Sequence, residues 1–89
     1  MLIALIARDK PGALQIRLET RDAHVTYLKT TGVVAQAGPL LDDDGQMCGS
    51  LVVLDLPDMA AAKSWAANDP YAHAGLFEDV QLIQWNKVI

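Results

Sequence analysis

The chain has very little cysteine, because Cys48 is the only one among its 89 residues. A single thiol cannot close an internal disulfide, and such usage is typical of a reducing compartment, so we expect a cytoplasmic protein. One cysteine and two histidines also fall short of the Cys/His clusters that form the usual zinc sites, so we expect no metal. The sequence contains no phosphate-binding loop and no dinucleotide-binding fingerprint.

Basic residues and long apolar runs are also scarce. Seven Lys and Arg stand against eleven Asp and Glu, for a net charge of −4. Nucleic-acid binding normally requires a basic surface that displaces counterions, so we expect no nucleic-acid partner. The apolar start, Met1–Ala7, is ended by Arg8 and Asp9, well short of the roughly 20 apolar residues that span a membrane. We therefore expect neither a membrane segment nor a secretory signal.

Apolar residues, in contrast, make up 52% of the chain. We expect one domain covering residues 1–89, and a domain of this size has only a small interior in which to bury them. Because a membrane is excluded, the excess predicts a surface for self-association.

Apolar runs and turn residues predict six elements in the order β-α-β-β-α-β. Gly32 is expected to end the first helix, Asp58 to cap the second, and the residues around Asp44-Gly45 to form a hairpin turn. This order is that of a ferredoxin-like α+β fold, with an antiparallel sheet and both helices on one face. The expected strands are Met1–Arg8, Val33–Leu41, Cys48–Leu56 and Phe77–Ile89, and the expected helices are Ala13–Thr31 and Met59–Asn68.

The last predicted strand is apolar on both faces, because Val80 and Leu82 alternate with Ile83 and Trp85. Helices cover only one face of this sheet, so the other face needs a second layer. The same sheet of another copy, packed face to face, would supply it. We therefore expect a homodimer.

Candidate chemistry gathers on the first helix. At about 100° per residue, Leu14, Leu18, Val25 and Leu28 form one stripe that is expected to face the sheet. His24 lies at the shoulder of this stripe, with Arg17 and Arg21 on neighbouring turns. A neutral imidazole held by a carboxylate can act as a general base, but periodicity alone favours a packed histidine bonded to a backbone carbonyl. The two arginines are either solvated or bind an anion.

Asp69 also has two readings. It can cap a short helical turn that begins at Pro70, or it can be the carboxylate partner of His24. Spacing alone does not bring Asp69 and His24 together. His73 is expected on the surface.

Taken together, these pieces resemble the YCII-related proteins, small bacterial domains of the dimeric α/β-barrel superfamily. The likeness runs through almost the whole chain in order. The matching pieces are His24 with Tyr27-Leu28, Gly32, Ala37-Gly38-Pro39-Leu40, Asp44-Gly45, Gly49-Ser50, Asn68-Asp69-Pro70-Tyr71 and Ala74-Gly75-Leu76.

The resemblance implies a ferredoxin-like homodimer with an active site built on His24 and Asp69. It also implies that Ser50, Gly38 and Pro39 line the same pocket. One relative is a dehydrochlorinase without a metal or organic cofactor, so the family suggests a cofactor-independent lyase or hydrolase for a small polar or aromatic molecule. Tyr71 stands where many relatives carry Phe, and its hydroxyl is expected to affect ligand preference. The alternative is a non-catalytic dimer that binds or senses a small ligand in this pocket.

Overall fold

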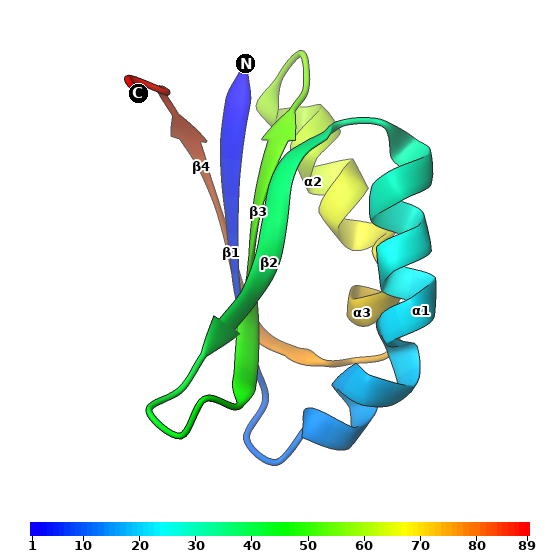
Figure 1. Cartoon of the computed structure of the whole chain (residues 1–89). Coiled ribbons are helices and arrows are strands. Elements are labelled where there is room, and N and C mark those ends of the chain that lie inside the picture. Colours follow the sequence, from blue (N-terminus) through cyan, green and yellow to red (C-terminus); the bar gives the residue numbers. More distant parts are fainter.

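The computed structural model describes all residues from Met1 to Ile89. Four antiparallel strands form one sheet in the order β2-β3-β1-β4, and the helices cover one of its faces (Figure 1). The ferredoxin-like prediction is therefore confirmed. The elements are β1 (Leu2–Asp9), α1 (Leu14–Thr31), β2 (Val34–Leu41), β3 (Met47–Asp55), α2 (Met59–Ala67), α3 (Pro70–His73) and β4 (Phe77–Trp85).

Short-range signals set the ends of these elements. Gly32 follows α1 in the left-handed region, with φ 70°, where a glycine is favoured. The Asp58 side chain accepts a hydrogen bond from the Ala61 N–H at 2.8 Å and caps α2, as the sequence predicts. Most predicted boundaries shift by one residue. The last strand is shorter than predicted because β4 ends at Trp85, and Val88 lies beyond it.

The core lies between the sheet and the helices. Ile3, Leu5 and Ala7 of β1 alternate with outward residues and point toward the helices. Val52 of β3 lies beside Leu5, and this inner face packs against α2. The buried residues of this main cluster are Ile3, Leu5, Ala7, Val52, Leu54, Ala62 and Trp65.

Helix α1 faces the sheet with a side that is shifted from the expected stripe, since Leu14, Val25 and Leu28 are half-buried but Leu18 is not. Leu18 is 49% exposed, whereas Arg17 and His24 are the buried residues of this helix. The predicted stripe is therefore wrong at Leu18, because the pattern argument assumes that apolar residues face inward. Here two polar side chains occupy the inner side of α1, where hydrogen-bond partners satisfy them.

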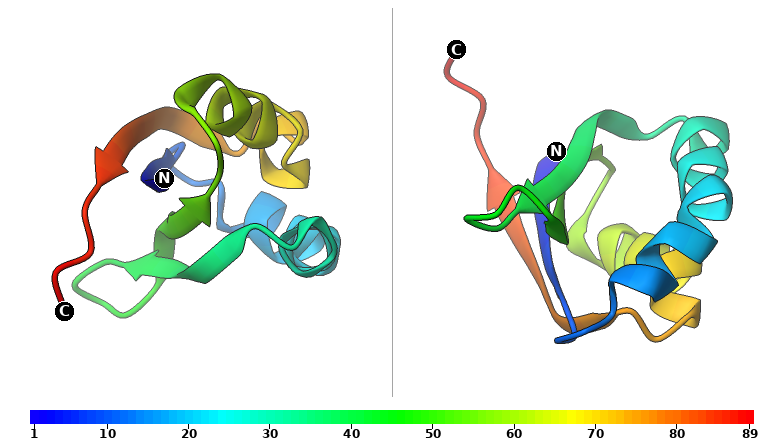
Figure 2. Two further views of the ribbon diagram at one scale, coloured as in Figure 1. Left: turned by 90° about the horizontal axis from the view of Figure 1, so that it is seen from above. Right: turned by 60° about the horizontal axis from the view of Figure 1, so that its bottom comes forward.

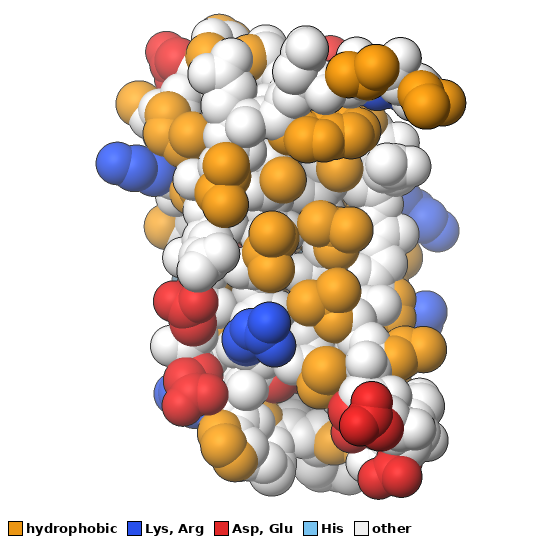
Figure 3. Space-filling view, turned by 90° about the vertical axis from the view of Figure 1, so that its left-hand side faces the viewer, with side chains coloured by type: hydrophobic (Ala, Val, Ile, Leu, Met, Phe, Trp, Pro, Cys, Tyr) orange, Lys and Arg blue, Asp and Glu red, His pale blue; other side chains and the backbone are white.

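The outer face of the sheet is apolar and uncovered. Register places Ile83 opposite Ala4 and Trp85 opposite Leu2, so these four side chains share the outer face, while Leu82 points inward. Figure 3 shows hydrophobic side chains along the middle of this face, and Figure 2 shows that every helix lies on the other side. None of the helices combines the length and the hydropathy that a membrane-spanning helix requires.

Gly49 is required by a close approach of two strands. A Cβ atom at this position would collide with the backbone carbonyl oxygen of Ala7 on β1. We expect Gly49→Ala to lower the free energy of unfolding by about 1–3 kcal/mol, the usual cost of overpacking, as measured by urea denaturation. Gly38→Ala is the matched control, because a Cβ there meets nothing within 4 Å. Equal stabilities for the two variants would contradict this explanation.

Candidate active site

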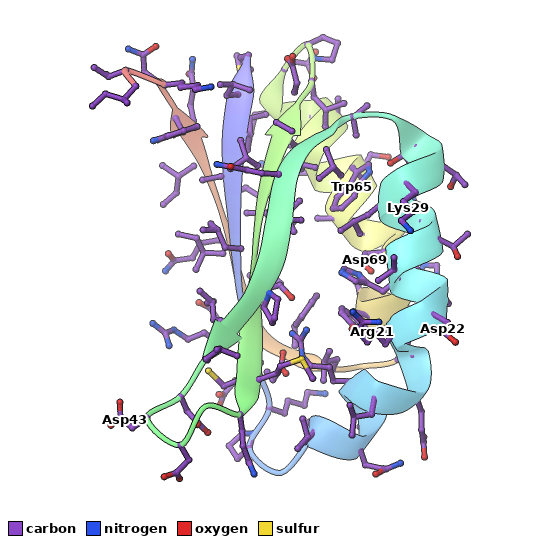
Figure 4. All side chains as sticks on the ribbon, viewed as in Figure 1. Arg21, Asp22, Lys29, Asp43, Trp65 and Asp69 are labelled. Atoms are coloured by element: carbon purple, nitrogen blue, oxygen red, sulfur yellow. The ribbon has the colours of Figure 1, made fainter.

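A cavity of about 470 Å³ lies between α1 and the inner face of β2 and β3. Figure 4 shows Arg21 directed from α1 toward the space between helix and sheet, whereas Asp22 points away from it. Most of the residues predicted for the site line this cavity. The lining comprises Arg17, Arg21, His24, Val25, Leu28, Lys29, Gly32, Val34, Ala37, Gly38, Pro39, Met47, Ser50, Val52 and Tyr71.

His24 lines the cavity and contacts Asp69, which lies behind the cavity wall. Their side chains are buried, and Nδ1 of His24 lies 2.8 Å from Oδ1 of Asp69. The same oxygen accepts the Tyr71 backbone N–H at 2.9 Å, so Asp69 caps α3 and holds His24 at once. Asp69 therefore makes both of the contacts that the sequence left open, the cap on α3 and the contact with His24.

This contact determines which ring nitrogen of His24 is bound by the protein and which is open to the cavity. An ionised carboxylate only accepts hydrogen bonds, so the Nδ1–H group of His24 is the donor and Oδ1 of Asp69 is the acceptor. The other ring nitrogen of His24, Nε2, has no protein partner and is not among buried unsatisfied atoms, which leaves it open to the cavity. In the neutral imidazole whose proton is on Nδ1, Nε2 has a lone pair that can accept a proton.

Tyr71 fixes the plane of the imidazole. The chain leaves α2, and Pro70 at the first position of α3 sets the backbone for a tight turn. This turn stacks the Tyr71 ring on that of His24, with centroids 3.8 Å apart and planes 15° apart. Phe77 closes the arrangement, meeting the Tyr71 ring edge-on at 5.9 Å. The histidine is thus held by a hydrogen bond at one edge and by an aromatic ring on one face.

Arg17 is engaged by a carboxylate that sequence reasoning missed. Its Nε and Nη2 donate to the two oxygens of Asp9 at 2.7 and 2.8 Å, and Nη2 also donates to Ser50 Oγ at 2.9 Å. Burial opposes the guanidinium charge, but Asp9 outweighs burial and raises the pKa of Arg17. The guanidinium also lies 4.7 Å from the centre of the Tyr71 ring. No sequence motif links Asp9 to Arg17, which are eight residues apart across a turn.

Tyr71 lines the cavity together with two cationic side chains, Arg17 and Arg21. Burial raises the pKa of Tyr71, although the nearby charges of Arg17 and Arg21 act in the opposite direction. The phenol is therefore protonated at neutral pH. The Tyr71 hydroxyl lies close enough to the Arg17 guanidinium to interact with it, and Tyr71 lines the cavity, so its O–H can donate to a ligand there.

The raised pKa of Tyr71 predicts a loss of stability in alkali. The folded state keeps the phenol neutral, so its contribution to stability is complete below the unfolded value of about 10 and declines as the pH rises above it. We expect Tyr71→Phe to lose less stability than the unsubstituted protein between pH ~8 and pH ~10.5, as measured by urea midpoints. An identical decline in both proteins would contradict the prediction.

The remaining candidates divide between the cavity and the surface. Gly38 and Pro39 lie on edge strand β2 and line the cavity beside Ser50, to which Pro39 is directly opposed. His73 is exposed, as expected, and Asp42 folds back to accept hydrogen bonds from Asp44 and Gln46 in the hairpin turn. No three His, Cys, Asp or Glu side chains come together in a way that could hold a metal ion.

The fold and the site define a small ferredoxin-like protein with a buried His–Asp pair facing a cavity between helix and sheet. Residues 1–86 match the YCII-related domain. The chain belongs to this family.

Relatives of known sequence and structure agree with that assignment. The chain is 35% identical to protein YciI of Escherichia coli and 34% identical to an uncharacterized protein of Haemophilus influenzae, each over an alignment of 97 positions that covers 99% of both chains. It is also similar to 5-chloro-2-hydroxyhydroquinone dehydrochlorinase (TftG) from Burkholderia phenoliruptrix, solved in complex with 2,5-dihydroxybenzoquinone. The TM-score is 0.88 and the identity 32%, with coverage of 97% of this chain and 94% of that one.

A more distant likeness concerns the fold alone. An antibiotic biosynthesis monooxygenase is 17% identical, with a TM-score of 0.62 over the full length of both chains.

Proposed function

We propose that this protein is a cofactor-independent lyase in which His24 transfers protons and Asp69 orients the imidazole. The observation that carries the proposal is the 2.8 Å contact between the buried His24 and Asp69 side chains, beside an open cavity. The similarity to a dehydrochlorinase supports the same reaction class. The single cysteine supports a location in a reducing compartment such as the cytoplasm.

The geometry suits proton transfer at the cavity wall. Nε2 of His24 takes a proton from a substrate hydroxyl, and the Asp69 carboxylate stabilises the imidazolium that forms. In a dehydrochlorination of a chlorinated hydroxyquinol, His24 returns that proton to the chlorinated carbon of the ring. Chloride then leaves with the C–Cl electron pair as a second hydroxyl proton is lost, so the overall change is loss of HCl and formation of a quinone.

The remaining lining residues suit a flat, oxygen-bearing molecule. Ser50 and Tyr71 carry hydroxyls, while Val25, Leu28 and Val52 provide apolar surface. A small hydroxylated aromatic molecule would place its ring against the apolar side chains and its oxygens near the polar ones.

The proposal is tested with the ligands of the dehydrochlorinase. We expect the protein to release chloride from 5-chloro-2-hydroxyhydroquinone and to bind 2,5-dihydroxybenzoquinone, measured with a chloride electrode and by calorimetry. Binding of the quinone without chloride release would favour the alternative, a non-catalytic dimer that binds or senses a small ligand. If the protein neither binds the quinone nor releases chloride, a dehydrochlorinase-like function is contradicted.

We also propose that the protein acts as a homodimer through the outer face of its sheet. Ile83 is 51% exposed and Trp85 39% exposed on this face, which carries few charges along its centre (Figure 3). Packing of two such faces would bury both apolar surfaces.

Light scattering at micromolar concentration is expected to give twice the 9.6 kDa mass of one chain. Ile83→Glu places a charge in the proposed interface and should yield monomers, whereas Lys63→Glu on the helical side should leave the dimer intact. A mass near 9.6 kDa for the unsubstituted protein would contradict the dimer.

A further inference from the structure

The wall of the cavity carries three cationic side chains and no carboxylate. These are Arg17, Arg21 and Lys29, all from α1. They are three of only seven Lys and Arg in a chain whose net charge is −4. The two carboxylates of the site, those of Asp9 and Asp69, pair with Arg17 and His24 and do not form part of the wall. An acidic protein thus lines the helical side of this cavity with positive charge.

The two arginines differ in how their charge is balanced. Arg17 forms a buried two-pronged ion pair with Asp9, so its charge is offset and its position is held. Arg21 has no carboxylate within ion-pair distance and is exposed at the cavity. Arg21 lines the same cavity as Tyr71, and the charges of Arg17 and, to a smaller extent, Arg21 both act to lower the pKa of that phenol. Arg21 therefore brings an unbalanced charge to the wall, whereas Arg17 brings mainly hydrogen-bond donors.

Lys29 is also unpaired but lies farther along the helix. Eight residues separate it from Arg21, which corresponds to about 12 Å along an α-helix. His24 and the apolar residues Val25 and Leu28 lie between the two cations. A ligand that touches His24 and Tyr71 is therefore nearer to Arg21 than to Lys29.

We propose that the cavity binds a flat organic anion and that Arg21, not Arg17, selects for its negative charge. The ionised oxygen lies between Arg21 and the Tyr71 hydroxyl, and the ring rests on the apolar wall. Arg17, locked by Asp9, shapes this end of the cavity, and Lys29 attracts the anion from solution. The proposal rests on the proposed function only in assigning the ligand to the same cavity.

Matched pairs of anionic and neutral aromatic probes test this selectivity. Benzoate with benzamide, and salicylate with salicylamide, differ mainly in charge. Titrations followed by two-dimensional ¹H–¹⁵N NMR should move the amide signals of Ser50 and Tyr71, and each carboxylate should bind roughly tenfold or more tightly than its amide. Arg21→Gln should remove this preference while leaving amide binding unchanged.

Two control variants separate a local contact from a general effect of charge. Lys63→Gln changes the net charge equally but lies on α2, away from the cavity lining, and should leave the preference intact. Lys29→Gln should weaken carboxylate binding severalfold at low salt, and the effect should fade as ionic strength rises. The proposal is overturned if carboxylates and amides bind with equal affinity, or if Lys63→Gln loses the carboxylate preference as fully as Arg21→Gln does. It is also overturned if no probe at millimolar concentration shifts the amide signals of Ser50 and Tyr71.

The anion-site proposal and the lyase proposal can fail independently of each other. Carboxylate preference in a protein whose turnover does not depend on His24 would overturn the lyase and leave the anion site standing. His24-dependent turnover with equal binding of carboxylates and amides would overturn the anion site alone.

Discussion

Replacement of His24 by glutamine is expected to lower kcat for chloride release by about 10²–10⁴-fold, the usual contribution of a positioned general acid or base. Glutamine keeps a polar side chain near Asp69 but cannot accept and return a proton at Nε2. The effect should fall on kcat more than on KM, because the ligand contacts of Arg21 and Tyr71 remain. Steady-state kinetics with 5-chloro-2-hydroxyhydroquinone measure the change.

The companion variant Asp69→Asn tests the role of the carboxylate. Its amide oxygen can still cap α3, but the imidazole loses the charge that holds its proton on Nδ1. We expect kcat to fall by up to about 10⁴-fold with the fold preserved, as judged by circular dichroism. Unchanged kcat/KM in His24→Gln, with the fold intact, would contradict catalysis by this pair.

Loss of Asp9 is expected to cause the largest change in stability. The side chains of Arg17 and Asp9 are 3% and 6% exposed, so Asp9→Asn leaves a buried guanidinium without its counter-charge. Breaking a buried ion pair on one side typically costs about 3–5 kcal/mol, which is a large part of the stability of a small domain. Urea denaturation should report a loss of this size.

Two further variants keep this prediction decisive if Asp9→Asn does not fold. Asp9→Asn combined with Arg17→Met removes both charges and should recover much of the lost stability, because no buried charge remains unpaired. Asp22→Asn on the outer side of α1 should change stability by less than about 0.5 kcal/mol. A double variant no more stable than Asp9→Asn alone would contradict an electrostatic origin.

The sequence predicted the fold well, because the signals that end helices and strands are local. Gly32 and Asp58 act on neighbouring backbone groups, so their effects are visible without knowledge of the remaining structure. The last strand was placed less well. Val88 and Ile89 are apolar and fall within the predicted last strand, but no partner strand extends beyond Trp85, and a strand requires a partner for its hydrogen bonds.

The inner side of α1 shows where pattern reasoning fails. The predicted apolar stripe is half-buried at Leu28 but exposed at Leu18, and the two fully buried residues of the helix are Arg17 and His24 beside it. Burial of polar groups is favourable only when partners satisfy them, and those partners come from other elements. The helix therefore departs from the simple pattern at the site.

By itself, the sequence determined the order of the elements, the apolar excess and the identity of His24 as a candidate. Only the tertiary structure decided which carboxylates serve His24 and Arg17. His24 and Asp69 are 45 positions apart, and no local preference acts over that length. They meet because α1 and α3 pack side by side on one face of the sheet. Asp9 and Arg17 are brought together when α1 packs on the sheet. That packing buries the guanidinium, which is stable there only beside a counter-charge.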